Sequence, residues 1–168
     1  IASPTLRDPN FARTVVLLCE HSDKGSMGLV VNRPSEHTVA EGITGMPEKA
    51  TLRLFWGGPV QQQVVLVLHR HAIDTPEGRE VADGMTLGGD SEALMQILES
   101  DPQAQARVRV ISGYAGWGAG QLQAEMEEHS WIVLPGSAPL VFTVEPESMW
   151  SEALRELGPR FAHLTTIP

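Results

Sequence analysis

Two pairs of residues in this sequence have the types and the spacing that nucleophilic or metal chemistry requires. Cys19 and His21 end an apolar run, and a strand there would place both on one face, about 7 Å apart along the backbone. A thiolate needs a nearby base or positive charge, which His21 could supply. The pair indicates an enzyme or a redox-sensitive thiol. The competing interpretation is that Cys19 is a small buried hydrophobe.

His69 and His71 repeat this spacing where another apolar run ends. Two imidazoles on one face could bind a metal ion together with a carboxylate from elsewhere in the chain. No third ligand is evident in the sequence, and histidines near strand ends are commonly hydrogen-bonded without a metal. We therefore expect no metal ion and no other cofactor.

The glycine-rich segment 113–122 is the densest local signal, reading Gly-Tyr-Ala-Gly-Trp-Gly-Ala-Gly-Gln-Leu. It matches no phosphate-loop or dinucleotide fingerprint, and its glycines predict a turn between a strand and a helix. The helix N-terminus could hold an anion beside a stacking aromatic ring, or the glycines could only allow close packing while Trp117 fills the core. The residues expected to bind a ligand or partner are Gly57, Gly58, Gly113, Tyr114, Gly116, Trp117, Gly118, Gly120 and Gln121.

Composition narrows the range of partners. The 168 residues include 12 Lys and Arg against 21 Asp and Glu, a net charge of -9. Such a chain repels phosphate, so direct nucleic-acid binding is disfavoured. A single cysteine suits a reducing compartment, and no apolar run reaches the roughly 18–20 residues of a membrane span. We expect a cytoplasmic protein that does not enter the membrane.

The hydrophobic pattern predicts one α+β domain over residues 1–168, with a mixed sheet and helices packed on it. Strands are expected at 14–20 and 28–32 as a hairpin with a long turn, at 52–56 and 64–68 as a second pair, and at 107–112, 131–134 and 140–144. Helices are expected at 90–101, 122–129 and 148–157. The stretch 71–89 is expected to be irregular.

The order of several short motifs resembles the YqgE/AlgH family of bacterial proteins. The matching pieces are Ile1-Ala2-Ser3-Pro4, Asp8, Phe11, Thr14-Val15, Glu20-His21, Gly25, Gly28-Leu29-Val30, Asn32, Pro34, Gly57-Gly58-Pro59-Val60, Leu68-His69, Gly113–Trp117, Gly120-Gln121-Leu122, Glu125 and Trp131. The resemblance implies a bent mixed sheet that forms a pseudo-barrel with flanking helices. It implies no reaction and no catalytic residues, and it brings with it a transcriptional-regulator label.

We therefore expect a regulatory or accessory protein that acts through a protein partner or a small ligand. Its working surface is expected where the loops 22–26, 57–63 and 113–121 meet, because loops on a rigid scaffold commonly carry function. The alternatives are a transcriptional regulator, against which the acidic charge argues, and an enzyme that uses Cys19 and His21 or the two histidines.

Overall fold

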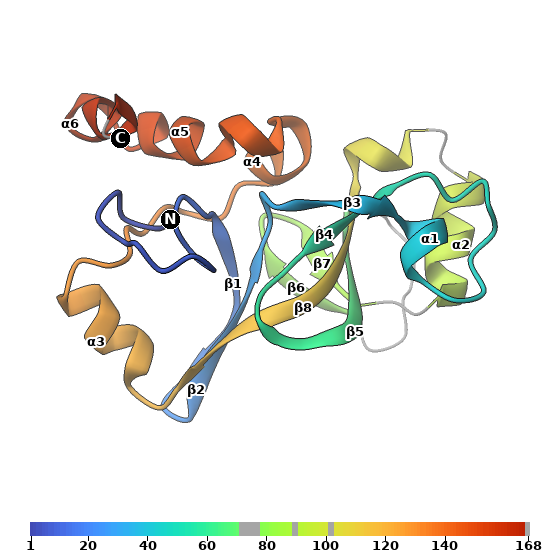
Figure 1. Ribbon diagram of the computed structural model, residues 1–168, viewed down its shortest axis with the longest axis horizontal. Helices are drawn as coiled ribbons and strands as arrows, with labels where there is room; N and C mark the ends of the chain where they lie inside the picture. Colours follow the sequence, from blue (N-terminus) through green and yellow to red (C-terminus); the bar gives the residue numbers. More distant parts are fainter. Residues whose placement is uncertain (71–77, 89–90, 101–102, 167–168) are drawn as a thin grey trace.

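A bent, nearly closed sheet forms the centre of the molecule (Figure 1). The computed structural model describes residues 1–70, 78–88, 91–100 and 103–166. Within these residues the sheet has eight strands, with the order β1-β2-β8-β5-β7-β6 and with β4 joining β3 to β8. The two ends of this order approach each other, because Arg79 of β6 forms an ion pair of 3.2 Å with Glu20 of β1.

The strands are β1 (Val16–Ser22), β2 (Gly25–Val30), β3 (Pro34–Thr38), β4 (Arg53–Trp56), β5 (Val60–His69), β6 (Arg79–Ala82), β7 (Met85–Leu87) and β8 (Val108–Gly118). The helices are α1 (Val39–Gly42), α2 (Ser91–Ser100), α3 (Gln121–Glu127), α4 (Ala138–Thr143), α5 (Pro146–Glu156) and α6 (Pro159–Ala162), with two short 3₁₀ turns at Ala104–Ala106 and His163–Thr166. This confirms the expected α+β class and the barrel-like sheet.

Strand β8 holds the sheet together. Its first half pairs with β4 in parallel and with β5 in antiparallel fashion, and its second half pairs with β2. The predicted pairing of 52–56 with 64–68 is therefore wrong, since both segments are strands but each pairs with β8 instead. The predicted hairpin of β1 and β2 is confirmed, although its turn is short because the strands continue to Ser22 and Gly25.

The glycine-rich segment is a strand and not the predicted turn. Residues 113–118 continue β8, and Ala115 to Gly118 pair with residues 25–28 of β2. At Gly113 the neighbouring backbone lies too close for a side chain, since a Cβ there would be 2.6 Å from Gly58 O. Gly113 and Gly120 both have a positive φ, of 75° and 70°, but Gly113 lies within β8, whereas Gly120 makes the turn that directly precedes α3.

Helices α2, α3 and α5 confirm three predicted helices within a few residues at their ends, while two predicted strands are wrong. Residues 140–144 lie mostly in α4, because Ser137 accepts a hydrogen bond from the Leu140 N–H and caps a helix that has a proline in its first turn. Segment 131–134 contributes only one bridge, between Trp131 and Ala2.

The stretch 71–89, expected to be irregular, contains the β6–β7 hairpin with a turn at Asp83-Gly84. Residues 71–77 and 89 lie outside the described part. No helix in the described ranges combines the length and the hydrophobicity needed to cross a membrane.

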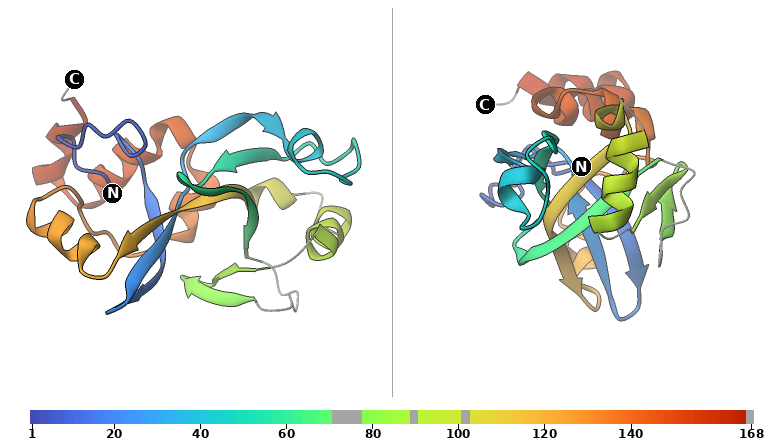
Figure 2. Two further views of the ribbon diagram at one scale, coloured as in Figure 1. Left: turned by 60° about the horizontal axis from the view of Figure 1, so that its bottom comes forward. Right: turned by 90° about the vertical axis from the view of Figure 1, so that its right-hand side faces the viewer.

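Three apolar clusters surround the sheet. The largest lies between the sheet and α4 and α5, which run along one side of the molecule together with α6 (Figures 1 and 2). The second lies under α1 and α2, at the opposite end of the molecule from α3. The third, smaller cluster packs α3 and the N-terminal segment on the end of β8. This third cluster forms one wall of the candidate site.

Candidate functional site

Three aromatic rings pack together where α3 meets β8. The centroid of the Trp131 ring lies 5.6 Å from that of Phe11 and 5.8 Å from that of Trp117, with both pairs in edge-to-face geometry. Phe11 also stacks on Trp117 at 6.3 Å. Such contacts each add about 0.5–1.5 kcal/mol beyond area burial. The rings therefore hold one another in fixed orientations.

A single carboxylate ties this aromatic cluster to α3. Glu125 Oε2 accepts the indole N–H of Trp117 at 2.9 Å and that of Trp131 at 2.7 Å, while Oε1 accepts a hydrogen bond from the Gln121 amide at 2.9 Å. Burial alone would raise the pKa of Glu125, but the hydrogen bonds from Trp131, Gln121 and Trp117 outweigh it and lower that pKa. Glu125 is therefore charged at neutral pH and fixes both indoles.

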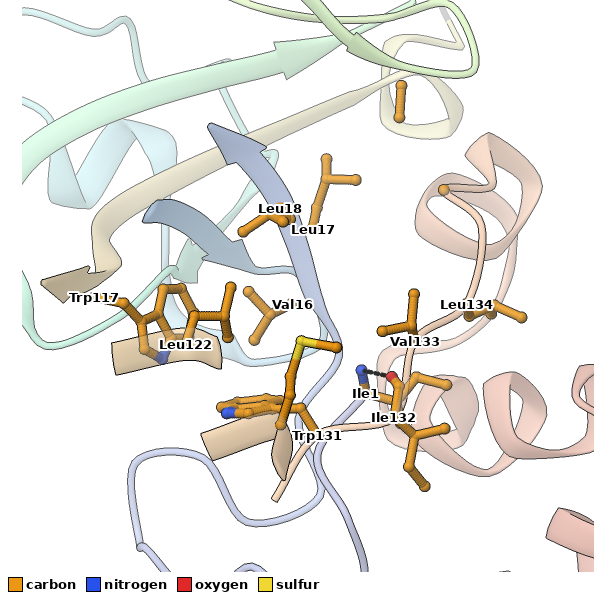
Figure 3. A pocket seen from close by; sticks show the side chains of 13 residues that line it. Ile1, Val16, Leu17, Leu18, Trp117, Leu122, Trp131, Ile132, Val133 and Leu134 are labelled. Carbon is orange, nitrogen blue, oxygen red and sulfur yellow. Dashed lines mark hydrogen bonds between the residues drawn. The ribbon is translucent and has the colours of Figure 1, made fainter. Parts of the chain in front are cut away.

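An apolar groove lies beside this cluster, between β1, α3 and the extended segment 131–136 (Figure 3). Its volume is about 190 Å³. Leu18 of β1 and Val133 line it and are 42% and 66% exposed. Leu122 and Met126 come from α3, one helical turn apart, and Trp131 lies between that helix and Val133. The groove is open to solvent and almost free of polar side chains.

Backbone contacts hold the walls of the groove in place. Ile1 and Ile132 exchange two backbone hydrogen bonds of 2.8 Å, next to the bridge between Ala2 and Trp131. Segment 131–136 is thus anchored at its start, where it leaves α3.

Helix α3 is fixed at both ends. At its start, the side chain of Gln121 accepts the N–H of Gly118 at 3.0 Å. At its end, His129 N–H donates to Met126 O and Ser130 N–H to Glu125 O, while His129 has φ of 59°. This is a Schellman motif with histidine where glycine is usual.

A second, polar hollow adjoins the groove and shares Leu122 with it. It lies between the β1–β2 turn and the start of α3, and its volume is about 390 Å³. His21 Nδ1 and Ser26 Oγ are 2.7 Å apart there, on neighbouring strands. Asp23 and Gln123 also line it.

The structure separates Cys19 from His21. A β-bulge falls at Cys19, since the register with β2 shifts between Leu18 and Glu20. Cys19 packs against the main core and donates its S–H to Leu17 O at 3.4 Å, whereas His21 is exposed and contacts Ser26. Burial raises the pKa of the Cys19 thiol to about 12, with only a small opposing effect of Arg79. The thiol is therefore protonated at neutral pH and is a poor nucleophile.

Of the second pair, His69 and His71, only His69 lies in the described part of the chain. His69 is fully buried at the end of β5, and His71 lies outside the described residues. In the described ranges no group of three His, Cys, Asp or Glu side chains is arranged to hold a metal ion.

The expected binding glycines divide into two groups. Gly57, Gly58 and Gly113 are buried and bring two backbone segments together. A Cβ on Gly57 would lie 2.3 Å from Gly113 O, and one on Gly58 would lie 2.2 Å from the carbonyl of Tyr114. These glycines thus pack the β4–β5 connection onto β8. Segments 22–26 and 57–63 each contact segment 113–121, the former at residues 117–118 and the latter at Tyr114, mainly as paired or packed backbone.

The remaining expected residues lie further along β8 and at the start of α3. Tyr114 is half-buried, and Gly116, Gly118, Gly120 and Gln121 are exposed. Gly118 and Gly120 line the polar hollow, and Trp117 lines the apolar groove, so these three reach a cavity.

Sequence reasoning misses most of the groove. The apolar pattern places Leu18 in a buried strand, and Val133 in a strand that does not form. The signal that could have located the groove is the pair Glu125 and Trp131, because a carboxylate six residues before a tryptophan across a helix end can accept its indole N–H. The exposure of Leu18 and Val133 follows only from the three-dimensional arrangement.

Comparisons with known proteins agree on one family. A family model described as AlgH-like matches residues 1–162. A UPF0301 protein of Chlorobaculum tepidum is 43% identical over 168 residues, which cover 100% of this chain and 89% of that protein. A UPF0301 protein of Chlamydia felis is 37% identical over 171 residues and covers the same shares.

Solved structures give the same result. The solution structure of the AlgH protein from Pseudomonas aeruginosa has a TM-score of 0.79 and 34% identity, and the match covers 99% of this chain and 90% of that one. A crystal structure of a Corynebacterium diphtheriae protein shares the fold, with a TM-score of 0.74, 23% identity and coverage of 99% and 88%. The chain therefore belongs to the AlgH-like family.

Proposed function

We propose that this protein is a cytosolic accessory or regulatory protein that works by binding, and that the groove between β1 and α3 receives its protein partner or small ligand. The observation that carries the proposal is the exposure of Leu18 and Val133 on the walls of one groove. In the described part of the chain these are the exposed large hydrophobic side chains. Both side chains line the same groove, and exposed apolar side chains that cluster are typical of an interaction site.

The rigidity of the groove supports the same proposal. Trp131 forms part of its wall and is held by Glu125, by two neighbouring rings and by the backbone bridge to Ala2. A site formed before its ligand arrives avoids the entropic cost of ordering on binding.

Two alternatives have weaker support. An enzyme that uses Cys19 would need an accessible thiolate, whereas this thiol is mostly buried and has a raised pKa. A transcriptional regulator that binds DNA directly would need a basic surface, whereas the chain has a net charge of -9. Regulation through a protein partner is compatible with that charge.

Site-specific photo-crosslinking tests the proposal. A photoreactive amino acid replaces Val133 in the cells that produce the protein, and the same residue replaces Thr51 as a control. Thr51 is exposed and lies outside the groove. We expect an adduct from position 133 and none from position 51, with its yield reduced by Leu18→Ser. The mass of the adduct distinguishes a polypeptide from a small ligand. Equal adducts at both positions, or none, would contradict the proposal.

A further inference from the structure

We infer that the occupant of the groove is a segment of a protein partner in which a bulky apolar side chain is flanked by lysine or arginine. This inference rests on the proposed function and names the chemistry of the partner. It follows from three features of the molecule: the volume of the groove, the charge along its α3 edge, and the charge of the whole chain.

The volume favours a side chain over a complete small ligand. Pockets that enclose drug-sized molecules measure about 300–1,000 Å³, and a cavity of about 150 Å³ holds one benzene ring. At about 190 Å³, the groove has room for one aromatic or branched side chain. Partner proteins commonly bind through a few such anchors, each buried in a pocket of this kind.

The edge of the groove is acidic along α3. Leu122 and Met126 line the groove, and helical geometry places Gln123 and Glu127 in the neighbouring row on the same helix. Glu127 is exposed and accepts a hydrogen bond from the Gln123 amide at 3.2 Å. Glu128 follows it and is exposed too. Acidic side chains at a helix C-terminus face the negative end of the helix dipole, so a cation there gains stabilisation.

No lysine or arginine belongs to the elements that form this edge. Helix α3 and Glu128 contain no lysine or arginine, and segment 130–137 contains no charged residue at all. On the β1 side of the groove, Glu20 pairs with Arg79, and Lys24 follows Asp23 in the sequence. His129 follows Glu128 in the sequence, and the segment that contacts Ser130 through Ser3 contains Arg7. Neither Glu127 nor Glu128 takes part in an ion pair among the described residues.

The charge of the chain decides between two kinds of protein occupant. A second copy of this chain carries the same net charge of -9, so docking it at an acidic edge would bring like charges together. A basic partner segment is attracted by the same acidic edge. Complementary charge also raises the rate of association, by an amount that falls with ionic strength.

Peptide binding to the whole protein tests the inference. Three short peptides share a Leu-Phe centre and differ in their flanks, which are lysine, glutamine or glutamate, with both termini capped to remove terminal charges. Calorimetry gives each affinity, and amide chemical shifts of Trp117, Met126 and Val133 show whether the peptide lies in the groove. We expect the lysine peptide to bind about three- to tenfold more tightly than the glutamine peptide, and the glutamate peptide most weakly.

Two variants separate charge from apolar contact. Glu127→Gln with Glu128→Gln removes the acidic edge and is expected to abolish the preference for lysine, as is 1 M salt, which shortens the Debye length to about 3 Å. Leu18→Ser with Val133→Ser keeps the charge of the edge and is expected to weaken the binding of all three peptides equally. Both pairs change exposed side chains, so the fold is retained.

The outcomes distinguish the two proposals. Equal affinity for lysine and glutamine peptides at the groove would overturn the basic-partner inference and leave the proposed binding function standing. A double glutamine variant that keeps the preference for lysine would overturn the same inference. If no peptide binds, or if the double serine variant binds all of them unchanged, the groove is not an anchor site for a partner segment and this inference fails, while photo-crosslinking at position 133 decides the proposed function.

Discussion

Trp131 donates its indole N–H to Glu125 Oε2 over 2.7 Å, across the end of the helix that separates the two residues in sequence. The same oxygen accepts the indole of Trp117, so one carboxylate positions two walls of the groove. The shape of the groove therefore depends on a charged group that does not itself line it.

Glu125→Gln is expected to lower the free energy of unfolding by about 1.5–3 kcal/mol, because hydrogen bonds to a charged acceptor are lost and an amide cannot accept all three donors as well. Chemical denaturation followed by tryptophan fluorescence measures the change. Glu127→Gln is the matched control on the same helix, since its side chain is exposed, and we expect it to alter stability by less than about 0.5 kcal/mol. Equal effects of the two variants would contradict the assigned role.

The stabilising effect of Glu125 is expected to depend on pH. Its pKa in the folded protein lies below the ordinary value of 4.5, so the folded state favours the charged form. The contribution is therefore complete above that ordinary value and is lost as the pH falls through the folded pKa. Thermal unfolding of the wild type and of Glu125→Gln from neutral to acidic pH checks this. Their difference in Tm is expected to stay constant down to about pH 5 and then to shrink.

His129→Gly is expected to stabilise the protein by about 1 kcal/mol, because a residue with a Cβ is strained in the left-handed conformation and glycine is not. His129→Ala keeps that strain and serves as the control, with little expected change. Urea denaturation of both variants measures the difference. A loss of stability in His129→Gly would show that the imidazole makes a contact worth more than the strain.

Gly58→Ala is expected to destabilise the protein by more than about 3 kcal/mol, since the new Cβ would collide with the Tyr114 backbone. Gly116→Ala is the contrasting case on β8. A Cβ there would meet its nearest atom, on the Tyr114 ring, at 3.7 Å, which is ordinary contact, so the expected change is below about 1 kcal/mol. Similar stability of the two variants would contradict the close packing of β8 on the β4–β5 connection.

Cys19 is expected to react slowly with iodoacetamide at neutral pH. A pKa of about 12 leaves a thiolate fraction about a thousandfold below that of an unperturbed thiol. The rate is measured by mass spectrometry on the folded protein, with the urea-unfolded protein as its own control. A folded-state rate equal to the unfolded rate would restore the reactive-thiol hypothesis.

The sequence predicts elements well where a local signal is strong. The apolar residues of α2 and α5 recur at helical spacing, and the β1–β2 hairpin has β-branched runs around turn formers, so the structure confirms all three. Strand pairing is harder to predict from the sequence. Strands β4 and β5 are neighbours along the chain, and yet both pair with β8. That choice depends on long-range packing, which no local pattern records.

The glycine-rich segment shows a second reason for error. Glycines are typical of turns, but Gly113 lies in a strand because β8 passes very close to Gly58. In the same way, 140–144 has the composition of a strand and forms a helix, because Ser137 and a proline start one just before it. Of these two regions, the glycine-rich segment contributes to the groove, through Trp117. Trp117 of its aromatic wall is among the residues expected from the sequence, whereas the exposed Leu18 and Val133 are not.

Native mass spectrometry of the protein isolated gently from its own cells tests the central claim most directly. Three forms are compared: the wild type, the groove variant Leu18→Ser with Val133→Ser, and a control variant with Thr51→Ser and Gln63→Ser, which are exposed positions outside the groove. We expect an added mass on the wild type and the control variant that is absent from the groove variant. A bare mass for all three forms, or an added mass that the groove variant retains, would contradict the claim that this groove is the working surface.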